Sequence, residues 1–510
     1  MAVLSHLGPT REDVAAIGDT VLVGVRLLGA TMLLPAVVAL AMGDVNSASA
    51  LLLGAAATVI VTGPLRNRLR RRGRLTWTQA FTATGIGWFV AAVAAAVPLW
   101  LSTHYARPVH ALVEAMAGLT TTGATLVSDL DHLPVAINLW RHELHVIGAI
   151  AVYLVIATIR LRGETMVATS TVAEAGEHRI LPRHSRSLRD VALLVGGWSA
   201  VGALVLTILA LIAGATPGRA LLHGVTLATS AFTTGGFTIT SASAGALHAT
   251  SVQIALAVLM IAGATSLVLH RVARARHMRL VHRELDLRVI VLSGASLLGV
   301  LLLVLTRADV QDTVSGMVGQ GLFTMIAAHT TTGMSAVPPQ MIASSWGDLA
   351  PAALVAAMAV GGMSGSLSGG VGTLRVGLIA KGLVRDVRQL LLPESALVIE
   401  RYHQRRTHKL TDQHVRASAT ILLLFMAAMF GGAVVELATT SSGTLPDALF
   451  SATSAVSTTG LSVGFVGANT PDLAVATSGL LMWFGRLEFL AVLAGIGLLA
   501  RGLPGVGGTR

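Results

Sequence analysis

The chain has 510 residues, of which 53% are hydrophobic and 12% charged, and its mean hydropathy is +0.73. Soluble globular proteins carry about 25% charged residues, so this composition excludes them and predicts an integral membrane protein. The chain has no cysteine, which excludes disulfides and thiol chemistry. Its net charge of +11 favours membrane topology over nucleic-acid binding, because the basic residues lie between apolar runs.

Apolar runs of about 20 residues predict membrane-spanning helices. Two N-terminal spans are expected near 18–42 and 48–64, and a unit of span, half-helix, polar segment and span then occurs four times. The result is an all-α fold with ten full spans and four half-helices. The units comprise 77–101, 107–119 and 138–161; 188–213, 219–232 and 250–271; 286–306, 315–329 and 349–382; and 413–438, 446–456 and 473–500.

The units divide the chain into an N-terminal two-span part with a basic loop, three repeats, a connector and a fourth repeat. The longest polar insert, 383–411, is expected to form a cytoplasmic or interfacial helix. In chain order, the six predicted parts are 1–75, 76–165 (repeat 1), 186–275 (repeat 2), 283–385 (repeat 3), 386–411 (connector) and 412–501 (repeat 4).

Basic residues concentrate in the loops that connect the units, beginning with Arg66 to Arg74. Acidic residues such as Asp129, Asp131 and Asp472 lie in the loops near the polar segments. By the positive-inside rule, the connections and both termini face the cytoplasm and the polar segments face outside. No cleavable signal peptide is evident at the start of the chain. We therefore expect a multi-pass protein of a bacterial cytoplasmic membrane.

Each half-helix is followed by a short segment of Thr and Gly, and this recurrence indicates one repeated unit. Hydroxyl-rich backbone inside a membrane is tolerated only when it is buried in protein or lines a water-filled cavity. Four such segments around one axis would present a ring of carbonyl oxygens, which suits a cation filter. The candidate filter residues are Thr121, Thr122 and Gly123; Thr234, Gly235 and Gly236; Thr331, Thr332 and Gly333; and Thr458, Thr459 and Gly460.

The half-helices strengthen this interpretation, because a helix C-terminus carries partial negative charge that attracts a cation. Glycine then allows the sharp turn that aims carbonyl groups at the axis. The alternative is helix packing, since small residues let membrane helices approach closely. That alternative explains scattered glycines, but not Thr-Gly clusters at the same place in four units.

The motifs resemble the pore-forming subunits of bacterial Trk/Ktr potassium-uptake systems, over nearly the whole chain. The stretch MAGLTTTGATLVSDLDHLP, at 116–134, is similar to the first pore loop of the Trk branch, and the two extra N-terminal spans also suit that branch. The resemblance implies K+ uptake through a gated, channel-like pore whose filter glycines are Gly123, Gly236, Gly333 and Gly460. A Ser at the first position would be similar to Na+-conducting relatives, so Gly123 favours K+.

The stretch GGMSGSLSGGVGT, at 361–373, resembles the family's intramembrane gate loop, which interrupts the second span of the third repeat. It lacks the Lys of a phosphate-binding loop, and a flexible linker is the remaining alternative. The residues that the resemblance assigns to the gate are Gly361, Gly362, Ser364, Gly365, Ser366, Gly369 and Gly370.

The stretch FGRLE, at 484–488, is similar to a family motif in the last span. The resemblance makes Arg486 an electrostatic barrier below the filter, because a charge at membrane depth usually lines a cavity. The alternative is a structural ion pair between Arg486 and Glu488. Two positions depart from the family pattern, since Gly148 stands alone where a glycine pair is usual and His329 replaces an apolar residue.

The resemblance also implies a homodimer that works with a cytosolic ring of nucleotide-binding regulatory subunits of the NAD or ATP type, in contact with membrane lipid. We expect no enzyme activity, no nucleic-acid partner and no covalently bound cofactor, and K+ is the transported ion. A less selective K+/Na+ transporter is the alternative within transport. A membrane sensor or intramembrane enzyme is disfavoured, because the spans hold no paired Asp and no His-Glu-x-x-His site.

Overall fold

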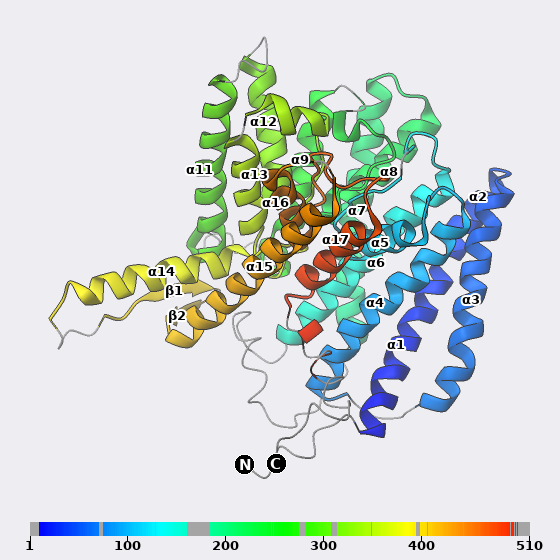
Figure 1. The fold of residues 1–510 in the computed structure, drawn as a ribbon, viewed down its shortest axis with the longest axis horizontal. Helices are drawn as coiled ribbons and strands as arrows, with labels where there is room; N and C mark the ends of the chain where they lie inside the picture. The colour runs from blue at the N-terminus through cyan, green and yellow to red at the C-terminus, as the bar shows by residue number, and fades with distance from the viewer. Residues whose placement is uncertain are drawn as a thin grey trace.

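Figure 1 shows the fold of a computed structural model, in which long helices surround a group of shorter ones. The structure describes residues 10–493, 495 and 497, except 71–74, 128, 161–183, 246, 248, 275–281, 308–313, 348, 394–397, 405, 442 and 490. Within these residues, seven helices are long and apolar enough to cross a membrane. The predicted all-α membrane fold is therefore confirmed.

The N-terminal helices pack along one edge of the molecule, on the right in Figure 1. Helices α1 (Arg11–Thr31) and α2 (Leu33–Ala41) form one apolar span, which α3 (Val45–Leu69) follows. Thr10 and Asp13 form a capping box that fixes the start of α1. Helices α1 and α3 both contact α4, so this pair covers the outer face of the first unit.

The rest of the chain forms four successive groups of helices. The first group is α4 (Trp77–Leu101), α5 (Pro108–Leu119) and α6 (Val135–Arg160); the second is α7 (His184–Ile212), α8 (Pro217–Phe232), the short helix η2 (Ser243–Gly245), α9 (Thr250–Ala264) and α10 (Leu267–Arg274). The third is α11 (Leu285–Arg307), α12 (Val314–His329), the π-helical turn η4 (Met341–Ser345), α13 (Leu349–Val360) and α14 (Thr373–Leu390); the fourth is α15 (Asp412–Thr439), α16 (Leu445–Val456) and α17 (Asp472–Arg486).

The four predicted half-helices correspond to α5, α8, α12 and α16. Proline occupies the first or second position of three of them, at Pro108, Pro217 and Pro446. Proline suits these positions because the first backbone N–H groups of a helix have no intrahelical partner. Each of the four helices ends where a Thr-Gly segment begins.

These helices close a ring. Each half-helix contacts the helix that follows the Thr-Gly segment of the preceding group: α6 contacts α8, α9 contacts α12, α13 contacts α16, and α17 contacts α5. The fourth group therefore returns to the first, and the four half-helices surround one axis. The exact boundaries assigned to the repeats remain predictions.

Three of the ten predicted spans are interrupted, which corrects the expectation of one interruption, in 349–382. The span predicted at 250–271 breaks between α9 and α10, at Thr265 and Ser266. The span predicted at 473–500 breaks after α17, in a turn at 487–489. Hydropathy alone does not detect the first of these breaks, because its hydrogen-bond partners lie on another segment of the chain.

The connector forms a β-hairpin where a helix was expected over 383–411. Helix α14 continues to Leu390, and β1 (Arg401–Gln404) then pairs antiparallel with β2 (Arg406–Lys409), which places Tyr402 opposite His408. Tyr402 is buried with Leu374 and Leu378 of α14, and this contact holds the hairpin against the helix. Both elements project to the left in Figure 1.

Several predictions lie outside the described residues. They concern most of the basic connections, at 71–74, 161–183 and 275–281, and the two termini, at 1–9 and 498–510. The cytoplasmic location of these segments stays a prediction.

Candidate functional site

The four Thr-Gly segments share one backbone conformation. Each has four residues, at 120–123, 233–236, 330–333 and 457–460. The second residue of each is a threonine with positive φ, namely Thr121 (49°), Thr234 (52°), Thr331 (52°) and Thr458 (53°). The fourth is a glycine with positive φ, namely Gly123 (72°), Gly236 (77°), Gly333 (73°) and Gly460 (79°). A β-branched residue with positive φ is strained, so the surrounding structure must hold it in place.

The four segments also touch in cyclic order. A Cβ atom added at Gly123 would collide with the carbonyl oxygen of Gly235 in the second segment. The same collision follows from Gly236 to Thr332, from Gly333 to Thr459 and from Gly460 back to Thr122. Four backbone carbonyls therefore lie at equivalent places around one closed ring, and only glycine leaves room for them.

Hydroxyl pairs stabilise three of the segments. The first and third residues are hydrogen-bonded between Thr120 and Thr122 (2.7 Å), between Thr330 and Thr332 (2.8 Å), and between Ser457 and Thr459 (2.7 Å). The second segment has Gly235 at the third position and lacks this pair. The His145 ring of α6 fills the space where a Gly235 side chain would lie, and it stacks on Phe237 with ring centroids 4.4 Å apart.

A fully buried ion pair lies behind the first two segments. Glu114 of α5 and Arg141 of α6 are both 0% exposed, and Arg141 Nε donates to Glu114 Oε1 at 2.8 Å. The carboxylate also accepts from the Thr125 hydroxyl (3.0 Å) and the Leu126 amide (2.8 Å), and Arg141 reaches the Thr238 carbonyl at 3.2 Å. The pair therefore connects the backbone of the first segment to that of the second.

Sequence reasoning missed this ion pair. The available signal was the presence of charged residues inside a half-helix and a span, because such residues are costly in a membrane and usually find a partner. Gly148, which stands alone where the family has a glycine pair, still packs closely. A Cβ atom there would collide with the Leu119 carbonyl, so α6 lies directly against the end of α5. The unusual His329 accepts or donates a 2.8 Å hydrogen bond with Ser293 of α11.

The glycine-rich loop, residues 361–373, contacts the Thr-Gly segments. Its Leu367 carbonyl accepts from the Thr234 hydroxyl at 3.0 Å, and its Gly369 amide donates to the Thr331 hydroxyl at 2.7 Å. A Cβ atom added at Gly369 would collide with the Ser457 carbonyl. The loop therefore contacts the second, third and fourth segments at once.

The same loop fills the break between α9 and α10. Its Met363 and Leu367 amides donate to the carbonyls of Ala264 (3.1 Å) and Gly263 (3.2 Å), and its Gly365 carbonyl accepts from the Leu267 amide (3.0 Å). Non-helical backbone at membrane depth needs such partners inside the protein. The break between α9 and α10 and the break between α13 and α14 therefore satisfy the backbone groups of one another. This pairing explains why the chain is interrupted after Ala264.

The predicted gate residues take the backbone shape of a tight loop. Gly361, Gly365 and Gly370 have positive φ, and a Cβ atom at Gly361 would collide with the Gly369 carbonyl. The Ser366 hydroxyl accepts from the Ser368 amide at 3.2 Å. The remaining residues assigned to the gate, Gly362 and Ser364, line a cavity of about 100 Å³ beside the loop.

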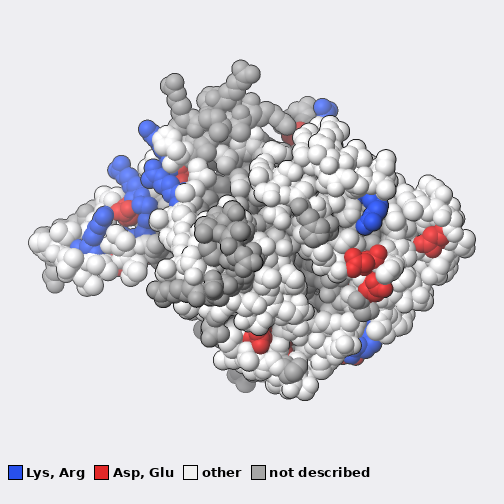
Figure 2. Space-filling model, turned by 90° about the horizontal axis from the view of Figure 1, so that it is seen from above, with Lys and Arg blue, Asp and Glu red and all other residues white. Residues whose placement is uncertain are grey.

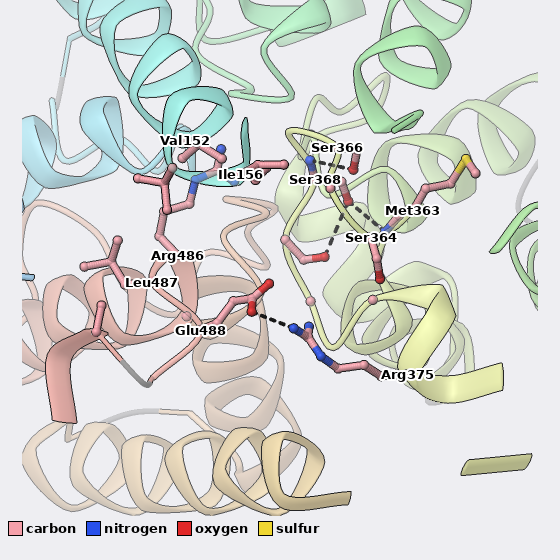
Figure 3. Close-up of a pocket in the computed structure, with 18 of the residues that line it drawn as sticks. Val152, Ile156, Met363, Ser364, Ser366, Ser368, Arg375, Arg486, Leu487 and Glu488 are labelled. Atoms are coloured by element: carbon pink, nitrogen blue, oxygen red, sulfur yellow. Dashed lines mark hydrogen bonds and ion pairs between the residues drawn. The ribbon is translucent and has the colours of Figure 1, made fainter. Parts of the chain in front are cut away.

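Two arginines line this cavity, which is drawn in Figure 3. Arg486, 7% exposed, donates from Nη1 to the Leu367 carbonyl of the loop at 2.5 Å. Arg375 and Glu488 point toward each other and form an ion pair of 2.5 Å, which joins the start of α14 to the turn after α17. Glu488 thus pairs with Arg375, whereas Arg486 is bound to the loop.

The described residues contain no group of three or more His, Asp or Glu side chains that could hold a metal ion. The polar groups that the four segments bring together are instead backbone carbonyls and threonine hydroxyls. Such neutral oxygens suit a monovalent cation that must bind and leave again.

Comparison with known proteins gives consistent matches along the chain. An uncharacterised cation transporter of Methanocaldococcus jannaschii is 24% identical over 95% of each chain. The Trk system potassium uptake protein TrkH of Halomonas elongata is 27% identical over 66% of this chain and 68% of that one. The crystal structure of the potassium transporter TrkH from Vibrio parahaemolyticus shares the fold, with a TM-score of 0.82 and 21% identity over 94% of this chain and 97% of that one.

The family model of TrkH, described as a cation transport protein, matches residues 48–496. That range contains all four Thr-Gly segments, the glycine-rich loop and Arg486. The chain therefore belongs to the TrkH family of cation transport proteins.

Proposed function

We propose that this protein takes up K+ through the axis of the four Thr-Gly segments. The observation that carries the proposal is the closed cycle in which each glycine faces the carbonyl of the next segment. A dehydrated cation needs several oxygen atoms at once, and this cycle supplies them from four equivalent directions. K+ is favoured because the Trk relatives from Halomonas elongata and Salmonella typhimurium are named potassium uptake proteins.

We further propose that the glycine-rich loop is the gate and that Arg486 is an electrostatic barrier. The loop contacts three of the four segments, and Arg486 is bound to its Leu367 carbonyl. Residues with positive φ and small side chains can change conformation at low steric cost. Displacement of the loop would break the hydrogen bond between Arg486 of α17 and the Leu367 carbonyl.

The homodimer and the cytosolic nucleotide-binding ring stay predictions from the family resemblance. So do the cytoplasmic termini and the location in a bacterial inner membrane. The names of several relatives describe parts of a Trk system, which supports a membrane subunit that works with partners.

The test is transport by the purified protein in liposomes, with tracer rubidium as the reporter for K+. We expect uptake that excess K+ competes away and that excess Na+ leaves almost unchanged. Equal competition by the two ions would favour the less selective K+/Na+ transporter. Liposomes that contain folded protein and take up no tracer, with or without a cytosolic extract, would contradict a transport function.

A further inference from the structure

A second cavity lies far from the ring, between α11, α14 and the β-hairpin. Its volume is about 280 Å³, well above the roughly 30 Å³ that one water molecule occupies in the liquid. Its lining is dominated by cationic and polar side chains from all three elements. These residues are Arg283, Leu285, Arg288, Lys381, Arg401, Tyr402, His403 and Thr407.

The charges around this cavity are not balanced. Arg283, Arg288, Lys381 and Arg401 contribute four positive charges, and no carboxylate lines the cavity among the described residues. Outside it, Glu400 pairs with Lys381 at 2.5 Å and with Arg388 at 3.3 Å, so one carboxylate is shared by two cations. In Figure 2, Lys and Arg gather on the left, the side where Figure 1 draws α14 and the hairpin.

Two residues that line the cavity carry buried polar atoms without partners. The Tyr402 hydroxyl and His403 Nε2 have no hydrogen bond in the described part of the chain, and Tyr402 is 2% exposed. Buried polar groups are normally satisfied, so the hairpin wall of the cavity is not fully hydrogen-bonded.

The N-terminus of α11 adds a further preference for negative charge. Leu285 is the first residue of this 23-residue helix and lines the cavity, with Arg288 in the same turn. A helix N-terminus carries partial positive charge and free backbone N–H groups, which attract anions. Arginine side chains bind phosphate through two parallel hydrogen bonds. These features all select a phosphate-type oxyanion.

The cavity is connected to the glycine-rich loop by one side chain. Asp286, which follows Leu285, accepts from the Thr373 hydroxyl (2.8 Å) and the Ser364 amide (3.4 Å) at the end and middle of that loop. Thr373 also begins α14, and Lys381 lies about two turns later on the same helix. A shift of α11 or α14 at the cavity would therefore move residues that hold the loop.

We propose that this cavity binds a phosphate-bearing anion and that its occupation is transmitted to the glycine-rich loop through Asp286 and α14. The proposed binding site is independent of the gate assignment. The proposed transmission rests on the function proposed above for the glycine-rich loop. A free phosphate compound and the headgroup of an anionic lipid share this chemistry, and the experiment separates them.

Binding is tested by thermal unfolding of the full-length protein. Inorganic phosphate is added in detergent at constant ionic strength, and in a second arm phosphatidylglycerol replaces phosphatidylcholine in nanodiscs. The test variants are Arg401→Gln and the double variant Arg283→Gln/Arg401→Gln. Arg416→Gln on neighbouring α15 is the matched control, because it removes the same charge from an exposed residue that does not line the cavity.

We expect stabilisation of the parent and of Arg416→Gln, and a loss of apparent affinity of about tenfold for each cavity arginine removed. A response confined to inorganic phosphate identifies a soluble phosphate, and a response confined to phosphatidylglycerol identifies a lipid headgroup. Equal responses from the double variant and the control, or no response to either addition, would overturn the proposed site. The single variant keeps the test usable if the double variant does not fold.

Transmission is tested by tracer rubidium uptake in liposomes, with the anion that bound in the first experiment. We expect its addition to change the uptake of the parent severalfold and to leave Arg283→Gln/Arg401→Gln unresponsive. Asp286→Asn should still bind the anion but lose the change in uptake. Binding without any change in the parent's uptake would refute the transmission and keep the site. Failure of the folded parent itself to take up tracer would instead refute the proposed function.

Discussion

The Thr-Gly segments and the helices that follow them differ in how closely the four groups repeat. The segments adopt the same positive φ values at their second and fourth positions in all four groups. The following helices differ, because α6 is continuous over Val135–Arg160 while its counterparts break after Ala264, Val360 and Arg486. The Thr-Gly segments thus form a nearly fourfold repeated layer. The helices that follow them, together with the glycine-rich loop, form an asymmetric layer below it.

The difference has a physical basis. A ring of equivalent carbonyls requires the same backbone from each segment, and hence glycine at the same place in each. The single glycine-rich loop contacts three of the four segments by itself, so the layer below needs no such repetition. The hydroxyls of Thr234 and Thr331 bind the glycine-rich loop, whereas those of Thr121 and Thr458 have no hydrogen bond within the described residues.

The largest expected effect concerns the buried ion pair that supports the repeated layer on one side only. Arg141→Met leaves the Glu114 carboxylate buried without its partner. Removal of one member of a buried pair costs about 3–5 kcal/mol, so the free energy of unfolding should fall by that order. Thermal unfolding of the purified variant measures the change.

Arg66→Met is the matched control, because Arg66 pairs with Asp19 at 2.9 Å but is 32% exposed. Loss of such a partly exposed pair costs about 1 kcal/mol or less. The double variant Glu114→Leu/Arg141→Met should recover part of the lost stability. If Arg141→Met and Arg66→Met unfold at the same temperature, the buried pair does not support the ring.

The second prediction breaks the ring itself. Gly123→Ser places a side chain where the Gly235 carbonyl lies, at a backbone φ of 72° that serine tolerates poorly. The carbonyl must move, so discrimination of K+ over Na+ should fall by about tenfold, which corresponds to 1.4 kcal/mol. Gly431→Ser is the control, because Gly431 of α15 has no atom within 4 Å of an added Cβ. Unchanged selectivity for Gly123→Ser in liposome flux would exclude Gly123 from the filter.

The sequence predicts the repeated layer well because its physical requirement is local. A turn that aims carbonyls at an axis needs Thr and Gly at fixed positions, so the residues predict the four half-helices and the recurring glycines that share a positive φ. The assignment of these glycines to a filter stays a prediction. The family resemblance identifies the glycine-rich loop, and nine glycines and serines between two apolar helices cannot continue a helix cheaply.

The asymmetric layer was harder to predict because its partners are distant in sequence. The break after Ala264 depends on amides of Met363 and Leu367, which belong to another repeat. The pairing of Glu488 with Arg375, in place of Arg486, depends on where α14 begins. The hairpin over 401–409 contains no apolar alternation and is held by the burial of Tyr402, which local sequence does not reveal.

The third prediction concerns the charge in the asymmetric layer. Arg486→Gln removes a positive charge bound to the Leu367 carbonyl of the loop, and Arg486→Lys keeps the charge. If the charge opposes the passage of cations, Gln should raise the maximal K+ uptake rate about fivefold, equivalent to roughly 1 kcal/mol. Apparent K+ affinity should change little, because the ring oxygens stay in place. Equal loss of both variants from the membrane would show that Arg486 has a structural role instead.

The smallest expected effect compares two equivalent positions of the ring. Thr331→Val removes a hydroxyl that accepts from the Gly369 amide (2.7 Å) and donates to Ser368 (3.1 Å), whereas the Thr121 hydroxyl has no partner among the described residues. A lost hydrogen bond is worth about 0.5–1.5 kcal/mol, so Thr331→Val should weaken loop closure and raise uptake about threefold. Thr121→Val removes the same hydroxyl from the same backbone position and should leave the uptake rate close to that of the parent. Because both threonines occupy the same place in the repeated layer, a change in ion binding alone would affect the two variants alike. Equal uptake rates for Thr331→Val and Thr121→Val would therefore mean that threonine contacts do not hold the loop. A faster rate for Thr331→Val alone would mean that the contact between Thr331 and the loop helps to close the pore.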